Sequence, residues 1–176
     1  MNLKLKRTPG LYVVGFMGAG KTTVGRHLAH RLGWNFFDTD LEIERAENCP
    51  ITEIFAARGE AEFRRLEHQV IEQHVRWIER GRPAVLALGG GAFAQESNRK
   101  LLDNNGITVW LDCPFEVVER RVKENADRPL ARDADRFAEL FAARRDTYRL
   151  AELHVPIESD DPEVTVAAIL HHPVMA

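Results

Sequence analysis

Residues 15–22, with the sequence GFMGAGKT, match the pattern G-x-x-x-x-G-K-[ST] at every fixed position. Glycines in such a loop let successive backbone N–H groups turn inward, where they can cradle phosphate oxygens. Lys21 can reach the β- and γ-phosphates of a nucleotide, and the Thr22 hydroxyl can ligate Mg²⁺. The helical pattern that begins at Lys21 adds the positive end of a helix dipole. The segment therefore predicts a nucleoside triphosphate site.

Two acidic residues, Asp38 and Asp40, follow a short apolar run predicted to be a strand over residues 35–37. A parallel sheet places its ligand-facing groups at the carboxyl ends of its strands. On an extended segment the two carboxylates would point the same way, so that one could hold Mg²⁺ and the other could accept a hydrogen bond from an attacking hydroxyl. Alternatively, Asp40 caps a helix over residues 41–46. Spacing alone leaves both interpretations open.

Arg64 could hold an acceptor molecule. It borders the apolar face of a charged helix predicted over residues 59–80, and a guanidinium in that place suits a bidentate grip on a carboxylate. A solvated side chain, or an ion pair within the helix with Glu60 or His68, is the alternative.

Two further segments are candidates for ligand contact. Gly89, Gly90 and Gly91 follow the most hydrophobic predicted strand, where glycine allows a ligand to approach the backbone closely; a plain loop is the alternative. Residues 125–136 are rich in Asp and Arg and have almost nothing apolar to bury. This segment is either a solvated loop or a lid that closes over a ligand.

The elements that must position these residues alternate along the chain. Short apolar runs separated by longer amphipathic stretches predict βαβ units and a parallel sheet with helices on both faces. We expect strands at residues 11–14, 35–37, 84–88, 108–111 and 154–157, and helices at residues 21–32, 59–80, 114–124 and 137–149, with a last helix opened by Asp161 and Pro162.

Length and composition narrow the class of protein. The chain has 176 residues, a formal net charge of -3 and two cysteines that form no C-x-x-C pair. This balance gives no electrostatic footprint for nucleic acid, and no apolar run is long enough for a membrane span. The first seven residues lack the apolar core of a signal peptide, so we expect a cytoplasmic protein. A base-reading N-K-x-D or T-K-x-D motif is absent, which favours a small kinase over a GTPase.

Taken together, these motifs resemble the shikimate kinase family over most of the chain. The order and spacing of several segments carry the resemblance: the phosphate loop, Asp38-Thr39-Asp40, residues 51–55 (ITEIF), residues 59–64 (GEAEFR), the three glycines, Arg128-Pro129-Leu130, and Arg144 before Tyr148. The resemblance implies an α/β P-loop fold like that of the nucleoside monophosphate kinases, with three layers, a five-stranded parallel sheet flanked by helices, and a mobile lid. It implies one domain over residues 1–176, with an acceptor-binding region near residues 39–80 and a lid near residues 125–137.

The activity implied by the resemblance is transfer of the γ-phosphoryl group of ATP to the 3-hydroxyl of shikimate, with Mg²⁺ as cofactor, in the pathway to aromatic amino acids. Catalytic roles would fall to Asp40, Lys21 and Arg128. The expected ATP contacts are Gly18, Ala19, Gly20, Lys21, Thr22, Thr23, Arg121, Arg128 and Pro162, with Arg121 and Pro162 bracketing adenine. The expected acceptor contacts are Asp40, Arg64, Gly89, Gly90, Gly91 and Arg144, and the expected Mg²⁺ contacts are Thr22 and Asp38.

Some positions depart from the family pattern. The stretch after Arg128 is shorter than in many members, and Asp160 stands near where a nucleotide-contacting Arg is common. Arg145 is a rival to Arg144, which is preferred for its spacing to Tyr148. The alternatives to shikimate kinase are another small-molecule kinase, such as gluconate kinase, and a nucleotide-binding domain without catalysis. We expect a monomer that binds neither nucleic acid nor membrane.

Overall fold

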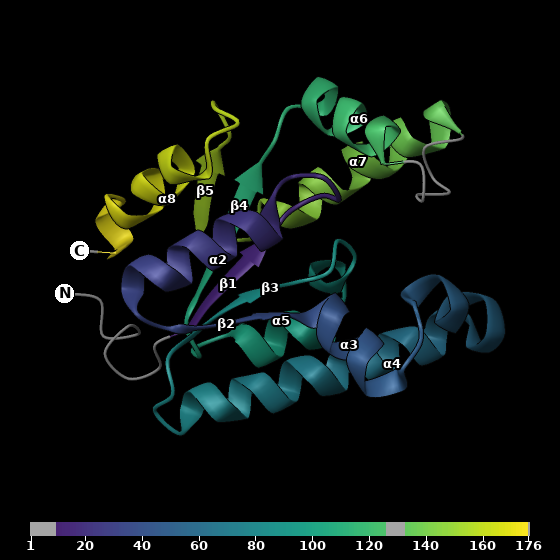
Figure 1. The fold of residues 1–176 in the computed structure, drawn as a ribbon, viewed down its shortest axis with the longest axis horizontal. Helices are drawn as coiled ribbons and strands as arrows, with labels where there is room; N and C mark the ends of the chain where they lie inside the picture. Colours follow the sequence, from purple (N-terminus) through teal and green to yellow (C-terminus); the bar gives the residue numbers. More distant parts are fainter. Residues whose placement is uncertain (1–9, 126–132, 176) are drawn as a thin grey trace.

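A computed structural model of the protein describes residues 10–125 and 133–175. Its centre is a parallel sheet of five strands in the order β2-β3-β1-β4-β5 (Figure 1). The strands are β1 (Gly10–Val14), β2 (Asn35–Asp38), β3 (Ala84–Ala87), β4 (Ile107–Asp112) and β5 (Leu153–Pro156). β1 and β3 are buried along their whole length, which explains why both read as continuous apolar runs rather than as alternating patterns.

Helices cover both faces of the sheet. α2 and α8 pack together on one face, while α4, α5 and α7 lie on the other (Figure 1). Among the described residues the α-helices are α2 (Lys21–Leu32), α3 (Thr39–Glu47), α4 (Ile51–Glu79), α5 (Glu96–Leu102), α6 (Phe115–Glu124), α7 (Ala134–Tyr148) and α8 (Pro162–Leu170), and the 3₁₀ helices are η1 (Ala92–Ala94) and η3 (Pro173–Met175). The prediction of a three-layer α/β fold around a five-stranded parallel sheet is confirmed.

The main core lies between the sheet and these helices, and a smaller apolar cluster supports the region of α3 and α4. Ile43, Ile54, Phe63 and Leu66 form this second cluster. It fixes the first part of α4 to α3, a helix that contains Asp40 and is capped by Asp38. The region of the predicted acceptor site is therefore supported by a separate apolar cluster.

The long helix begins earlier than predicted. α4 starts at Ile51 rather than Gly59, and Gly59 is a kink inside it, with φ 83° and ψ 170°. That left-handed φ favours glycine and interrupts the helix, so the segment after Gly59 is the helix predicted over residues 59–80, and the segment over residues 51–58 is the part that was not predicted. α5 was not predicted, because in this short helix only Asn98 and Leu102 are buried and no apolar period is visible.

The carboxyl ends of the strands bring the predicted site residues to one edge of the sheet. β1 leads into the phosphate loop, β2 ends at Asp38, and β3 leads into Leu88 and the glycine run. Across the described ranges 10–125 and 133–175, no helix is both long and apolar enough to cross a bilayer.

Candidate active site

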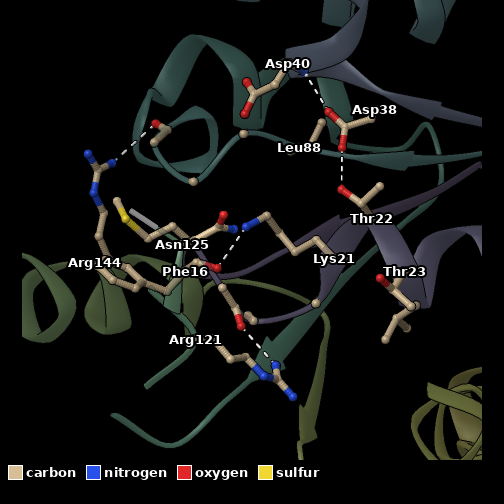
Figure 2. Close-up of a pocket in the computed structure, with 18 of the residues that line it drawn as sticks. Phe16, Lys21, Thr22, Thr23, Asp38, Asp40, Leu88, Arg121, Asn125 and Arg144 are labelled. Atoms are coloured by element: carbon tan, nitrogen blue, oxygen red, sulfur yellow. Dashed lines mark hydrogen bonds between the residues drawn. The ribbon is translucent and has the colours of Figure 1, made fainter. Parts of the chain in front are cut away.

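A large cavity opens at this edge of the sheet. It has a volume of about 980 Å³ and is lined by the phosphate loop, both acidic residues after β2, the start of α4, the glycine run and part of α6, α7 and α8. Figure 2 shows Lys21 near the centre of the cavity, with Asp38 and Asp40 on one side and Arg121 on the other. One continuous space therefore connects the predicted nucleotide site with the predicted acceptor site.

The phosphate loop has the backbone that its sequence predicts. Gly18 and Gly20 have φ values of 78° and 91°, and Gly20 is the N-cap of α2, so the loop turns directly into the helix N-terminus. The Lys21 ammonium donates a hydrogen bond to the Phe16 carbonyl oxygen at 2.9 Å. Its charge is thereby held over the loop, where the phosphates of a nucleotide would lie.

Thr22 and Asp38 are brought together from two different elements. The Thr22 hydroxyl donates to Asp38 Oδ2 at 2.5 Å, while Asp38 Oδ1 accepts from the backbone N–H groups of Asp40 and Leu41 (Figure 2). Asp38 is therefore the N-cap of α3. Hydroxyl and carboxylate oxygens are ligands that suit a hard cation such as Mg²⁺, which needs few protein ligands when phosphates and water complete its shell.

The expectation of an extended acidic segment, and the alternative that Asp40 is the cap, are both wrong. The helix begins at Thr39, one residue after Asp38, so the two carboxylates take different directions. Asp38 caps the helix because its side chain can reach the free N–H groups of the first turn. Asp40 does not cap the helix, and its side chain lines the cavity instead.

Asp40 lies in a partly dehydrated place close to other charges. Burial, reinforced by the nearby negative charge of Asp38, raises the pKa of Asp40 to about 6, while Lys21 and Arg64 oppose the rise. A Cβ atom added to Gly89 would lie 2.6 Å from Asp40 Oδ1, so the glycine leaves the space that this carboxylate occupies. The group stays ionised at neutral pH and is more basic than an ordinary aspartate.

Arg64 enters the cavity and is held by carboxylates of its own helix. Its Nη1 donates to Glu67 Oε1 at 2.8 Å, and its Nε lies 3.5 Å from Glu60 Oε1. The predicted alternative of an intrahelical ion pair is thus correct for Glu60 but not for His68, which contacts Asn98. Arg64 can pair with these carboxylates and still face the cavity, because a guanidinium has five N–H donors.

Glu67 was missed by sequence reasoning. Its side chain is 1% exposed, and burial raises its pKa to about 7, opposed by Arg64. Neither Glu67 Oε2 nor Arg64 Nε has a hydrogen-bond partner among the described residues. The spacing of three residues between Arg64 and Glu67 on a helix was the available signal.

The glycine run meets α7 in the part of the cavity lined by Asp40, Arg64 and Arg144, which we call the acceptor compartment. Arg144 Nη1 donates to the Gly91 carbonyl oxygen at 3.3 Å, and the Tyr148 hydroxyl donates to the Gly90 carbonyl oxygen at 2.5 Å. Arg144 lines the cavity, whereas Arg145 is bound to Asp112 outside it. The geometry thus agrees with the preference for Arg144, and it adds Tyr148 as the residue that secures the glycine backbone.

The expected adenine contacts lie at the other end of the cavity. Arg121 Nη1 donates to the Gly18 carbonyl oxygen at 2.9 Å, and its Nη2 donates to Asp160 Oδ1 at 2.7 Å. Thr23 and Pro162 also line the cavity. Arg128 and residues 126–132 of the predicted lid lie outside the described residues.

The fold and the site together define a P-loop kinase that acts on a small molecule. The nucleotide end and the acceptor end share one cavity and meet at the half-buried carboxylate of Asp40, which is what direct phosphoryl transfer between two bound molecules requires.

The chain belongs to the shikimate kinase family, since the family model for shikimate kinase matches residues 17–172. A shikimate kinase from Ruegeria pomeroyi is 48% identical over 148 residues, covering 84% of this chain and 70% of the relative. One from Persephonella marina is 39% identical over 161 residues, covering 91% and 96%. The structure of a shikimate kinase from Acinetobacter baumannii in complex with shikimate superimposes with a TM-score of 0.85 at 36% identity, covering 97% of this chain and 95% of that one.

Proposed function

We propose that this protein transfers the γ-phosphoryl group of ATP to the 3-hydroxyl of shikimate, giving shikimate 3-phosphate and ADP on the way to chorismate. One observation carries the proposal. The charges of both Lys21, from the phosphate loop, and Arg64, from the acceptor compartment, act on Asp40. Lys21, Asp40 and Arg64 also line one cavity, which supports a role for Asp40 between a phosphate and an acceptor hydroxyl, and membership of the family supports shikimate as the acceptor.

The acceptor compartment suits a small carboxylate that carries hydroxyl groups. In the proposed complex Arg64 and Arg144 bind the substrate carboxylate, since a guanidinium offers two parallel donors to it. The backbone of Gly89, Gly90 and Gly91 lies close to the substrate ring because no side chains intervene.

Asp40 orients the reacting hydroxyl by accepting its hydrogen bond. As the new bond forms between the hydroxyl oxygen and the γ-phosphorus, the bond from that phosphorus to the β,γ-bridging oxygen breaks and ADP leaves. Asp40 takes the proton that the hydroxyl releases. Its raised pKa suits this role, because the carboxylate is ionised at neutral pH and still basic enough to accept a proton.

The nucleotide end supplies binding and positive charge. Gly18, Ala19 and Gly20 offer backbone N–H groups to the phosphates, Lys21 adds an ammonium, Thr23 lines the phosphate end, and Arg121 with Pro162 flanks the base. Thr22 and Asp38 hold Mg²⁺, which supplies charge neutralisation on the phosphates when it is bound. A phosphate contact by Arg128, and closure of the lid, stay predictions.

The proposed enzyme works as a single domain and as a monomer in the cytoplasm, as the sequence leads us to expect. The remaining alternatives are a gluconate kinase and a nucleotide-binding domain without catalysis. The latter predicts loss of Lys21, Asp40 or Arg128, and the sequence retains all three.

A coupled ADP assay with Mg²⁺, run in parallel with shikimate and gluconate, tests the proposal. We expect turnover with shikimate and none with gluconate. Asp40→Asn should lower kcat by about 10²–10⁴-fold while ATP still binds, because it removes the group that accepts the proton. Asp146→Asn is the matched control, since that carboxylate is 77% exposed and should leave kcat unchanged. Equal turnover in Asp40→Asn and wild type would reject the assigned mechanism.

A further inference from the structure

Two consecutive arginines of α7 take different directions. Arg144 lines the acceptor compartment, while Arg145 lies outside the cavity and binds Asp112 at the end of β4. Successive residues of an α-helix are about 100° apart around its axis, so a contact that fixes one of the two side chains also sets the direction of the other.

The Arg144 side chain is held only weakly by its own hydrogen bond. Its hydrogen bond to the Gly91 carbonyl oxygen is long, at 3.3 Å, and a flexible arginine loses up to about 2 kcal/mol of side-chain entropy when it is ordered. In α7 only Phe137, near the start, and Tyr148, at the end, are fully buried among the described residues. The direction of Arg144 therefore depends on how the second half of the helix is anchored.

The contact between Arg145 and Asp112 has the properties of such an anchor. It is bidentate, with Nη1 to Oδ1 at 2.5 Å and Nη2 to Oδ2 at 3.1 Å. The Asp112 side chain is 14% exposed, and Oδ2 is also 2.7 Å from His154 Nε2 on the neighbouring strand β5. A partly buried, bidentate pair is stronger and more directional than a surface ion pair.

Trp110 completes the anchor. Its ring stacks on His154 at a centroid distance of 4.3 Å, and the Arg145 guanidinium lies over it at 5.2 Å. A guanidinium held by a carboxylate and an aromatic ring has little freedom to swing. The second half of α7 is thus fixed to β4 by this polar contact as well as by the buried Tyr148, whose ring packs against Trp110 at a centroid distance of 6.1 Å.

We propose that Asp112 and Arg145 are positioning residues that fix the orientation of α7 and thereby direct Arg144 into the acceptor compartment. The inference rests on the proposed function, in which Arg144 binds the substrate carboxylate. Neither positioning residue touches the substrate, and both act through Arg144. A displacement of about 1 Å can cost a bound substrate a large part of its reactivity, so a distant anchor of this kind has a measurable effect.

Steady-state kinetics of Arg145→Met and Asp112→Asn tests the proposal. The two variants change the local charge in opposite directions, yet both should raise the KM for shikimate about tenfold, which lies within the range of coupling between contacting residues, while the KM for ATP stays unchanged. KM does not depend on the fraction of folded enzyme, so a loss of stability alone leaves it unchanged. Arg145→Lys keeps the charge without the bidentate geometry and should raise the KM by less.

A double-mutant cycle separates positioning from a general structural role. In an Arg144→Ala background, Arg145→Met should add no further increase in the KM for shikimate, because the group through which it acts is already gone. Arg149→Ala is the control, since this arginine of the same helix end is 59% exposed and pairs with Asp146 at the surface.

Three outcomes would overturn the positioning role, and a fourth would overturn the proposed function. Opposite shifts of the KM in Arg145→Met and Asp112→Asn would show long-range electrostatics and overturn positioning. Additive effects in the double mutant, or an unchanged KM in both single variants, would also overturn it. A wild-type protein without turnover of shikimate would overturn the proposed function, and this inference with it.

Discussion

Gly89→Ala gives a direct test of whether the position of the Asp40 carboxylate limits phosphoryl transfer. The new Cβ atom would lie 2.6 Å from Asp40 Oδ1 and 3.1 Å from Glu67 Oε2. The φ of Gly89 is outside the left-handed region, so the backbone itself accepts alanine without strain. The substitution therefore acts on the two carboxylates and leaves the loop conformation in place.

The size of the effect follows from this distance. Optimal nonbonded contact lies near 3.5 Å, so the Asp40 carboxylate must retreat by about 1 Å. A displacement of that size costs on the order of 10²-fold in rate, or about 2.7 kcal/mol of transition-state stabilisation. The crowding itself costs about 1–3 kcal/mol of folding free energy, partly offset by the smaller entropy of the unfolded chain. The variant should fold and lose most of its activity.

The assay is kcat/KM for shikimate at saturating ATP, together with thermal unfolding. Gly33→Ala is the control. Its Cβ meets nothing within 4 Å, and its φ of 68° costs alanine about 1–2 kcal/mol, so stability falls at a place remote from the cavity. Equal activity of the two variants, within about threefold of wild type, would refute the argument that the location of Asp40 governs the rate.

Three other substitutions test single features of the site. Glu67 binds a proton at a higher pH in the folded protein than in the unfolded chain, so it makes the free energy of unfolding rise as pH falls from about 7 toward about 4.5. Glu67→Gln should flatten the corresponding rise in Tm, and an unchanged pH dependence of Tm would contradict this reasoning. Asp38→Ser keeps a side chain that can cap α3 but loses the carboxylate, so this variant should need more Mg²⁺ for its half-maximal rate. Asp38→Ala also loses the cap and should lose about 1 kcal/mol of unfolding free energy, whereas Asp38→Ser should not. Equal stability of the two variants would argue against the cap. Tyr148→Phe removes the hydrogen bond to the Gly90 carbonyl and should cost about 1–3 kcal/mol by chemical denaturation, and a loss within error of zero would contradict this.

Local sequence chemistry was enough to predict the phosphate loop and the sheet. The loop depends on glycine conformations and on a strand and a helix directly beside it, all of which are written into one short segment. The strands β1 and β3 are continuous apolar runs because both of their faces are covered, and such runs are visible without any tertiary information.

Elements held mainly by contacts with distant residues were predicted less well. Nothing in the sequence of α5 has a helical apolar period, and its place follows from packing against α4. The sequence predicts the segment of α4 after the non-helical Gly59 but not the segment over residues 51–58, whose Ile54 packs into an apolar cluster with Ile43 of α3. In both segments the local helical signal is weak, and contacts with residues distant in the sequence hold the helix in place.

The sequence alone determined which chemical groups are available and in what order, namely a phosphate loop, a pair of aspartates and several arginines. Only the tertiary structure decided which of these groups line the cavity and which are bound to other residues. Asp38 became the cap and the partner of Thr22, which left Asp40 for the cavity, and Arg144 faced the acceptor compartment while Arg145 was bound to Asp112. Capping and ion pairing depend on which groups meet across the fold, and that is fixed by strand order and helix orientation rather than by neighbours along the chain.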